Sequence, residues 1–157
     1  MRKTGKFPDK LHLILIPEAR RPWWKRWRKR RRKFRVTQPF RYVTSEGFTL
    51  AVPRGTTING ASIPCFCYRL IGPPCGDYFE ASAVHDWLWS VAVHGLKNGW
   101  PADFRWANAV FLDAMRTLGV ARWRRGLMWA AVSANGRFQV WKYSRQAAKA
   151  GRKRRSR

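Results

Sequence analysis

The feature that most constrains the fold of this 157-residue chain is a block of like charge near its N-terminus. Residues 20–35 contain eleven Lys and Arg side chains. Such a block repels itself and cannot enter a hydrophobic core, so it needs an anionic surface to order it. Residues 149–157 contain six more basic side chains. We therefore expect one folded domain between a basic arm and a basic tail.

The composition predicts a folded protein that has an anionic partner. Apolar residues make up 45% of the chain, which excludes a disordered protein, and the formal net charge is +25. This excess points to nucleic acid, an anionic membrane or an acidic protein surface. No stretch approaches the roughly 20 apolar residues of a membrane-spanning helix, and no apolar run suits a signal peptide. We expect the chain to be made in the cytoplasm and to stay there or join a particle.

Three tryptophans give the basic arm, residues 18–35, more than one interpretation. Trp23 and Trp27 would share one face of a helix. Indole rings favour the water–lipid interface while basic neighbours attract anionic headgroups, and the same rings could instead stack on nucleic-acid bases. A third interpretation is a solvated insertion whose rings cover the domain's own core. The residues expected to contact the anionic partner are Arg20, Arg21, Trp23, Trp24, Lys25, Arg26, Trp27, Arg28, Lys29, Arg30, Arg31, Arg32 and Lys33 in the arm, and Arg152, Lys153, Arg154 and Arg155 in the tail.

Alternating apolar residues predict a small antiparallel sheet. Residues 11–16 are typical of a short strand. Residues 40–44 and 48–52 alternate on either side of a glycine-containing turn, which predicts a hairpin. Residues 57–76 are rich in Gly, Pro and Cys and have little periodicity, so we expect a structured loop there.

Helical periodicity begins after this loop. The first predicted helix covers residues 77–93, where Asp77 and Glu80 form the pattern of a capping box. Gly95 is expected to end it. The second predicted helix begins at Pro101, since proline is favoured in the first turn.

The second helix is expected to stop at Gly119, and a third runs from about residue 121 toward residues 135–136. Residues 138–143 continue it after a break. The side chains expected to face the core are Tyr78, Ala81, His85, Leu88 and Ala92 of the first helix, Phe104, Asn108, Phe111, Leu112 and Met115 of the second, and Trp123, Leu127, Ala130 and Ala131 of the third.

These elements predict an α+β fold in which a small antiparallel hairpin or sheet packs on two or three helices. The expected organisation is an N-terminal segment with a short strand at residues 1–17, the basic arm at 18–35, a single α+β domain at 36–146 and a basic tail at 147–157.

The adjacent pair His85-Asp86 offers the candidate chemistry. Neighbours on a helix point about 100° apart, so the two side chains serve different tasks. The His can act as a general base if a carboxylate elsewhere fixes its other nitrogen. The Asp can hold a cation if other oxygens converge on it. Residues 57–113 hold five of the eight carboxylates, so we expect a site in this stretch.

The stretch 57–123 contains several linked motifs, which are NGASIP at 59–64, IGPP at 71–74, AVHDWL at 83–88, ANAVFLDAM at 107–115 and LGVARW at 118–123. Together they resemble an uncharacterised family of phage and prophage proteins, whose activity is not assigned. The resemblance covers about residues 34–134 and implies a virion or tail accessory protein, made in the host cytoplasm and in contact with other virion proteins.

The same order of motifs is more distantly similar to the bacterial and fungal secreted phospholipases A₂. This resemblance implies a pair of helices in which His85 is the general base for a water molecule. It also implies that Asp86 and loop oxygens bind Ca²⁺, which stabilises the oxyanion. Ser62 belongs to the same constellation. Asn59 stands where a second Asp ligand belongs, and Asn108 stands where the Asp that orients the His belongs.

These two departures favour a retained scaffold over a working enzyme. The Asn at 59 removes a negative charge from a hard-cation site, and the Asn at 108 can bond His85 but cannot stabilise an imidazolium. In the scaffold, Asn59, Ser62, His85 and Asn108 would form a buried hydrogen-bond network that pins the loop to two helices. We expect no cofactor, or Ca²⁺ if the site is active.

The predicted function is therefore a phage-type virion or tail accessory protein. Its His-Asp core is degenerate and phospholipase-like, and its basic Trp-rich arm binds an anionic surface, either a membrane or envelope surface or nucleic acid. Two alternatives stay open. One is an active Ca²⁺-dependent phospholipid hydrolase, and the other is a nucleic-acid-binding protein.

Overall fold

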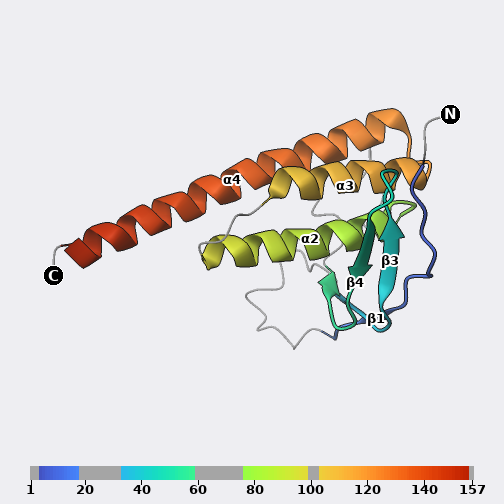
Figure 1. Cartoon of the computed structure of the whole chain (residues 1–157), viewed down its shortest axis with the longest axis horizontal. Helices are drawn as coiled ribbons and strands as arrows, with labels where there is room; N and C mark the ends of the chain where they lie inside the picture. The colour runs from blue at the N-terminus through green and yellow to red at the C-terminus, as the bar shows by residue number, and fades with distance from the viewer. Residues whose placement is uncertain (1–3, 18–32, 59–75, 99–102, 156–157) are drawn as a thin grey trace, which may run out of the picture.

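The computed structural model describes residues 4–17, 33–58, 76–98 and 103–155. This part of the chain contains short antiparallel strands followed by helices, so the predicted α+β class is confirmed (Figure 1). The elements are β1 (Leu13–Leu15), β2 (Phe34–Val36), β3 (Phe40–Val43), β4 (Thr49–Val52), β5 (Thr57–Ile58), α2 (Phe79–Lys97), α3 (Phe104–Thr117) and α4 (Arg122–Arg155).

The strands form two small antiparallel sheets. The predicted hairpin is confirmed as β3–β4, with Phe40 opposite Val52 and Tyr42 opposite Leu50. Gly47 in its turn has φ +95°, a conformation that glycine adopts without strain. The second sheet has the order β1-β2-β5, so the strand expected at residues 11–16 is present but shorter. Its middle strand, β2, begins within the predicted arm.

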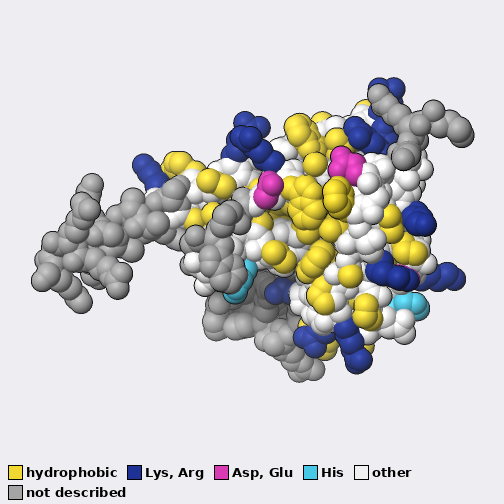
Figure 2. All heavy atoms as spheres, in the orientation of Figure 1, with side chains coloured by type: hydrophobic (Ala, Val, Ile, Leu, Met, Phe, Trp, Pro, Cys, Tyr) yellow, Lys and Arg dark blue, Asp and Glu magenta, His cyan; other side chains and the backbone are white. Residues whose placement is uncertain are grey.

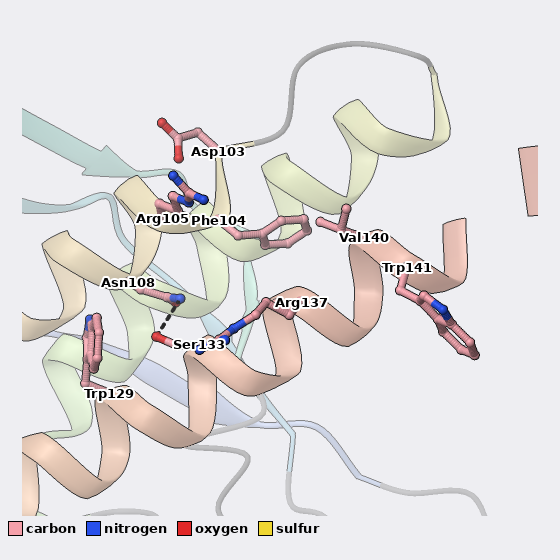
Figure 3. A pocket seen from close by; sticks show the side chains of 10 residues that line it. Asp103, Phe104, Arg105, Asn108, Trp129, Ser133, Arg137, Val140 and Trp141 are labelled. Atoms are coloured by element: carbon pink, nitrogen blue, oxygen red, sulfur yellow. Dashed lines mark hydrogen bonds between the residues drawn. The ribbon is translucent and has the colours of Figure 1, made fainter. Parts of the chain in front are cut away.

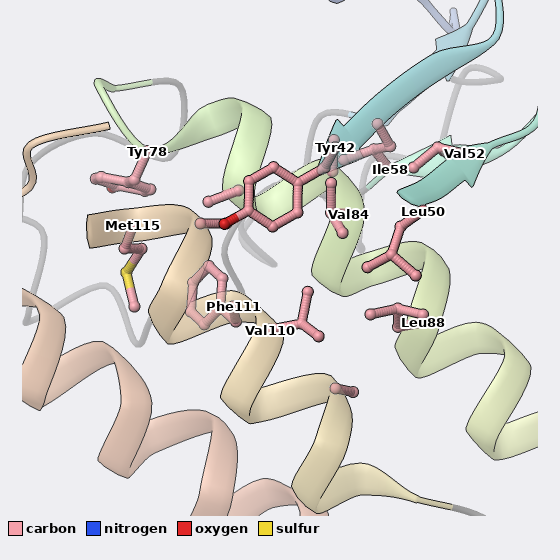
Figure 4. Close-up of a cluster of buried hydrophobic side chains, with 14 of the residues drawn as sticks. Tyr42, Leu50, Val52, Ile58, Tyr78, Val84, Leu88, Val110, Phe111 and Met115 are labelled. Atoms are coloured by element: carbon pink, nitrogen blue, oxygen red, sulfur yellow. The ribbon is translucent and has the colours of Figure 1, made fainter. Parts of the chain in front are cut away.

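The hydrophobic core lies between the sheets and the helices α2 and α3 (Figure 4). The inward residues of β3, Phe40 and Tyr42, are fully buried, as alternation along a strand requires. The Tyr42 hydroxyl donates to Asp113 Oδ2 of α3 at 2.7 Å, and the Ser45 N–H donates to the same oxygen at 2.9 Å. Burial raises the pKa of Tyr42, which keeps this hydroxyl protonated. One carboxylate therefore fastens the hairpin to α3.

Helix α2 has the predicted inward face but different ends. The capping box is wrong, because the residue before the helix is Tyr78, which makes no side-chain cap. Asp77 lies one residue earlier, where its carboxylate pairs with Arg124 at 3.2 Å. Gly95 does not end the helix and is buried within it. Asn98 supplies the terminal hydrogen bonds instead, since its N–H and side-chain amide donate to the last carbonyls.

Helix α3 begins and ends close to the predicted positions. It starts at Phe104 after an N-cap at Asp103, whose carboxylate accepts from the Trp106 N–H at 2.8 Å. Pro101 lies outside the described residues. Gly119 follows the end of the helix with φ +70°, so the predicted stop is confirmed. The inward face is also as predicted, with Asn108 among its buried side chains.

Helix α4 is longer than predicted and has no break. It continues through Gly136 to Arg155, so residues 147–155 of the predicted tail belong to it. Gly136 does not end the helix, and it lies where α4 packs closely against neighbouring side chains. A Cβ atom there would lie 3.4 Å from Phe104 Cβ and 3.5 Å from Trp89 Cη2. Figure 1 shows the C-terminal half of α4 extending past the N-terminal end of α3, to which α4 runs antiparallel.

The face of α4 that contacts the core is not the predicted one. Trp123 and Leu127 were expected to be buried, but they are 52% and 44% exposed. Ala130 and Ala131 are exposed as well. The core contacts come from the opposite side, where Met128 is 2% exposed. The sequence pattern identifies an apolar stripe correctly, but α4 carries two such stripes, and the spacing alone does not say which one packs.

Candidate functional site

The predicted partners His85 and Asn108 meet between α2 and α3. His85 Nε2 lies 3.0 Å from Asn108 Oδ1, and both side chains are buried. An amide oxygen only accepts hydrogen bonds, so Nε2 carries the hydrogen. The Asn at 108 thus holds the imidazole in one tautomer, with Nδ1 unprotonated.

The surroundings of His85 keep the imidazole neutral. Its ring lies 4.7 Å from the Phe111 ring and 5.3 Å from the Trp89 ring, measured between centroids. Burial lowers the pKa of His85 to about 4, and the hydrogen bond with Asn108 opposes that shift only in part. An imidazole with so low a pKa is a weak base near neutral pH. Its described contacts suit a structural hydrogen bond better than proton transfer.

A third helix joins the pair through a residue that sequence reasoning missed. The Asn108 amide Nδ2 donates to Ser133 Oγ of α4 at 3.3 Å (Figure 3). The hydrogen-bond chain His85–Asn108–Ser133 therefore links α2, α3 and α4. The signal that could have found Ser133 is its position between Val132 and Gly136 on the packed side of α4.

The structure describes only part of the predicted metal site. Asn59 and Ser62 lie outside the described residues, so the expected contacts of the loop with His85 do too. Asp86 follows His85 on α2 and is partly buried. Among the residues that the structure describes, no three His, Cys, Asp or Glu side chains gather closely enough to hold a metal ion. The nearby carboxylates of Asp103 and Asp113 serve as a helix cap and a hairpin anchor.

A groove of about 740 Å³ lies between the first turns of α3 and the middle of α4 (Figure 3). Phe104 of α3 and Trp129 and Val140 of α4 contribute apolar walls. Asn108 and Ser133 contribute uncharged polar groups, and the charged side chains of the lining are Asp103, Arg105 and Arg137. His85 is not among the lining residues, so the groove meets the buried hydrogen-bond chain only at its Asn108–Ser133 end.

The outer face of α4 carries exposed apolar side chains among basic ones (Figure 2). We call this set the outer stripe. Its large members, each between 44% and 55% exposed, are Trp123, Leu127, Phe138 and Trp141. The guanidinium of Arg145 stacks 4.6 Å above the Trp141 ring centre. No described helix is long and apolar enough to cross a membrane.

Most of the side chains predicted to contact the anionic partner lie outside the described residues. The arm residues Arg20 to Arg32 are not described. Lys33 is exposed, and its backbone carbonyl accepts from the Ile16 N–H at 2.9 Å. The backbone of Arg152 to Arg155 belongs to α4, but the side chains there are not described. The described side chains of α4 therefore form the part of the cationic and aromatic surface whose position the structure gives.

Comparison with known proteins gives a family match that covers β2 to β5, α2, α3 and the start of α4. Residues 34–132 match a family described as "Protein of unknown function (DUF1353)". The chain belongs to this family. The predicted membership of a family without an assigned activity is confirmed at that level, while the phage setting and the phospholipase likeness stay predictions.

Two curated relatives of this DUF1353 chain come from Sinorhizobium fredii (strain NBRC 101917 / NGR234). "Uncharacterized protein y4jT" is 32% identical over 104 residues, which cover 66% of this chain and 29% of the relative. "Uncharacterized protein y4iH" is 31% identical over 98 residues, which cover 62% of this chain and 38% of the relative. The chain therefore spans less than two fifths of either relative. No solved structure matches it significantly.

Proposed function

We propose that this protein attaches to an anionic membrane surface through the outer stripe of α4, aided by its basic arm. The observation that carries the proposal is the exposure of Trp123, Leu127, Phe138 and Trp141 along one side of a basic helix. Exposed apolar patches of this kind mark interaction surfaces. A helix with aromatic and aliphatic residues on one side and Lys and Arg around them suits the boundary between headgroups and acyl chains.

The charge of α4 selects the class of partner. Its 34 residues include eleven Lys and Arg and no Asp or Glu. A second copy packed on the same stripe would bring two strongly cationic helices together, which like-charge repulsion opposes. An anionic surface gains from those of these charges that face it, about 1 kcal/mol for each basic residue near the lipid headgroups.

The composition of the outer stripe favours lipid over nucleic acid. Between Trp123 and Trp141 the stripe continues through Leu127, Ala130 and Ala134, a length of about 27 Å along the helix. Aliphatic side chains gain nothing from stacking on bases, but they gain free energy when they leave water for hydrocarbon. Trp and Arg side chains place their polar ends in the headgroup region.

In this proposal the His85–Asn108 pair has a structural role and does not catalyse a reaction. The low pKa of His85 and the amide at position 108 both weaken a general base, so we propose that a phospholipase-like arrangement is retained without turnover. The setting we propose is a phage-type virion or tail accessory component. That setting rests on the motif resemblance, and a membrane-binding face suits a component that meets the host envelope.

Vesicle flotation of the full chain tests the proposal. Vesicles of phosphatidylcholine alone and of phosphatidylcholine with phosphatidylglycerol are compared at about 0.1 M and about 0.5 M salt. The account predicts binding to the anionic vesicles that weakens with salt but persists in part, because apolar insertion is not screened. Preference for a DNA duplex, with a steep loss of affinity in salt and no vesicle binding, would favour the nucleic-acid alternative instead.

A further inference from the structure

We propose that the groove between α3 and α4 binds a single anionic amphiphile, a molecule with one carboxylate or phosphate headgroup and one hydrocarbon chain. The inference rests on the proposed membrane attachment for the source of this ligand. The size, the walls and the charges of the groove support this ligand independently of that attachment.

The size of the groove suits a small ligand. Its volume of about 740 Å³ lies within the range of about 300 to 1,000 Å³ that is typical of ligand sites. Its walls on α4 run from Trp129 to Trp141, a distance of about 18 Å along the helix axis. An elongated groove of this length fits a chain rather than a compact sugar or nucleotide.

The walls that would contact a bound hydrocarbon chain are apolar. Phe104 points from α3 toward α4, and Val140 stands opposite it (Figure 3). Val140 and Trp141 are 45% and 51% exposed. A bound hydrocarbon chain would cover these side chains, and removal of their apolar surface from water is favourable.

The charges of the groove select an anionic headgroup. Arg105 of α3 and Arg137 of α4 are exposed cations that line it. The one carboxylate among the lining residues, Asp103, accepts a hydrogen bond from the Trp106 N–H as the cap of α3. The local balance is therefore positive, and guanidinium groups match the geometry of carboxylates and phosphates.

A hydroxyl donor completes the polar part of the groove. Ser133 Oγ accepts a hydrogen bond from the Asn108 amide. That contact uses an oxygen lone pair and leaves the Ser133 hydroxyl hydrogen for a ligand oxygen. Because His85 does not line the groove, the geometry provides a binding site and not a site of ester cleavage.

The groove opens beside the surface that the proposed function places on the membrane. Trp141 belongs both to the groove and to the outer stripe. Trp141 thus connects the surface proposed to face the bilayer with the groove in which the lipid or fatty acid would lie. The protein would hold one amphiphile in addition to lying on the surface.

Calorimetric titration of the full chain with decanoate, in the absence of vesicles, tests the site. Decanol and inorganic phosphate are the matched probes, since the first lacks the charge and the second lacks the chain. We expect decanoate to bind at least tenfold more tightly than either. Amide NMR signals of Ser133 and Val140 should shift on addition of decanoate, which locates the ligand. Equal binding of inorganic phosphate, or decanoate binding that leaves these signals unmoved, would overturn the proposal.

Variants separate the headgroup from the chain. The double change Arg105→Gln with Arg137→Gln should weaken decanoate binding at least fivefold and leave decanol binding unchanged. Val140→Ser should weaken both. Arg116→Gln, an exposed arginine in the last turn of α3, is the matched control and should change neither.

The outcomes for the groove and for the membrane are distinguishable. Decanoate is tested without a bilayer, so the groove can fail while vesicles still bind, or vesicles can fail while decanoate binds. Unchanged decanoate affinity in the double arginine variant would refute the groove as the site of the headgroup.

Discussion

His85 Nε2 and Asn108 Oδ1 lie 3.0 Å apart in the buried space between α2 and α3. The geometry makes the imidazole the donor and leaves it neutral. Buried polar groups are costly unless they are bonded, so this contact fixes how the two helices are placed against each other. Ser133 extends the same chain to α4, so three helices depend on one amide side chain.

Replacement of the amide by a carboxylate should alter the acidity of the histidine. In Asn108→Asp, a negative charge beside the imidazole favours its protonated form, so we expect the pKa of His85 to rise from about 4. NMR titration of the histidine ring protons measures the change. Asn135→Asp adds the same charge at an exposed position and should leave the pKa of His85 where it is. An unchanged titration in Asn108→Asp would contradict the observed pairing.

The stability of the fold should depend on pH through His85. Its folded pKa is about 4, below the usual value of 6.5, so the unfolded chain binds more protons between these two values. Its contribution is fully present above pH 6.5 and is lost as the pH falls toward 4, by up to about 3 kcal/mol. Urea unfolding across this range measures it. His85→Gln should flatten the profile, whereas His94→Gln, at an exposed position, should retain it.

The hairpin should loosen when its anchor on α3 is removed. Asp113→Ala leaves the Tyr42 hydroxyl and the Ser45 N–H without their shared acceptor. We expect a loss of about 1 to 3 kcal/mol in the free energy of unfolding, because two part-buried donors lose this acceptor and only the Tyr42 hydroxyl keeps another, Thr117 Oγ1 at 3.2 Å. Glu46→Ala in the exposed turn of the same hairpin is the control and should change the free energy by less than about 0.5 kcal/mol. Equal effects of the two variants would show that Asp113 does not fasten the hairpin.

Two glycines in α4 should respond in opposite directions. A Cβ atom at Gly126 would meet no atom within 4 Å, so Gly126→Ala should stabilise the protein by up to about 1 kcal/mol. Gly136 packs against Phe104 and Trp89, and Gly136→Leu should destabilise it by about 1 to 3 kcal/mol. Thermal and urea unfolding of both variants measure these effects. Stabilisation by Gly136→Leu would mean that α3 and α4 do not approach closely at this point.

Much of the fold was predictable where one face of an element is buried. The alternation of Phe40 and Tyr42 with polar neighbours identifies the hairpin strand, because only one side of it can meet the core. The same reasoning gives the inward faces of α2 and α3. It also places His85 and Asn108 on those faces, so their pairing follows from the helix periods.

The errors fall where local signals compete with tertiary packing. Gly95 and Gly136 resemble helix stops, but both are buried within helices. Gly136 lies inside α4 at the point where the side chains of Phe104 and Trp89 approach the helix closely. Asp77 has the right spacing for a helix cap, but its carboxylate forms a salt bridge with Arg124 of α4, which is distant in sequence. Helix α4 has an apolar stripe on each of two sides, and its periodicity cannot say that Met128 rather than Trp123 meets the core.

The most direct test of the central claim removes apolar side chains from the outer stripe and leaves its charge intact. The double variant Leu127→Ser with Phe138→Ser changes two exposed residues of the stripe, and Phe48→Ser changes a residue beside the hairpin turn that is at least as exposed. Flotation with anionic vesicles at high salt compares both with the unmodified chain. The account predicts about tenfold weaker binding for the double variant, since two half-exposed side chains no longer enter hydrocarbon, and no change for Phe48→Ser. Equal binding by all three proteins would contradict attachment through α4.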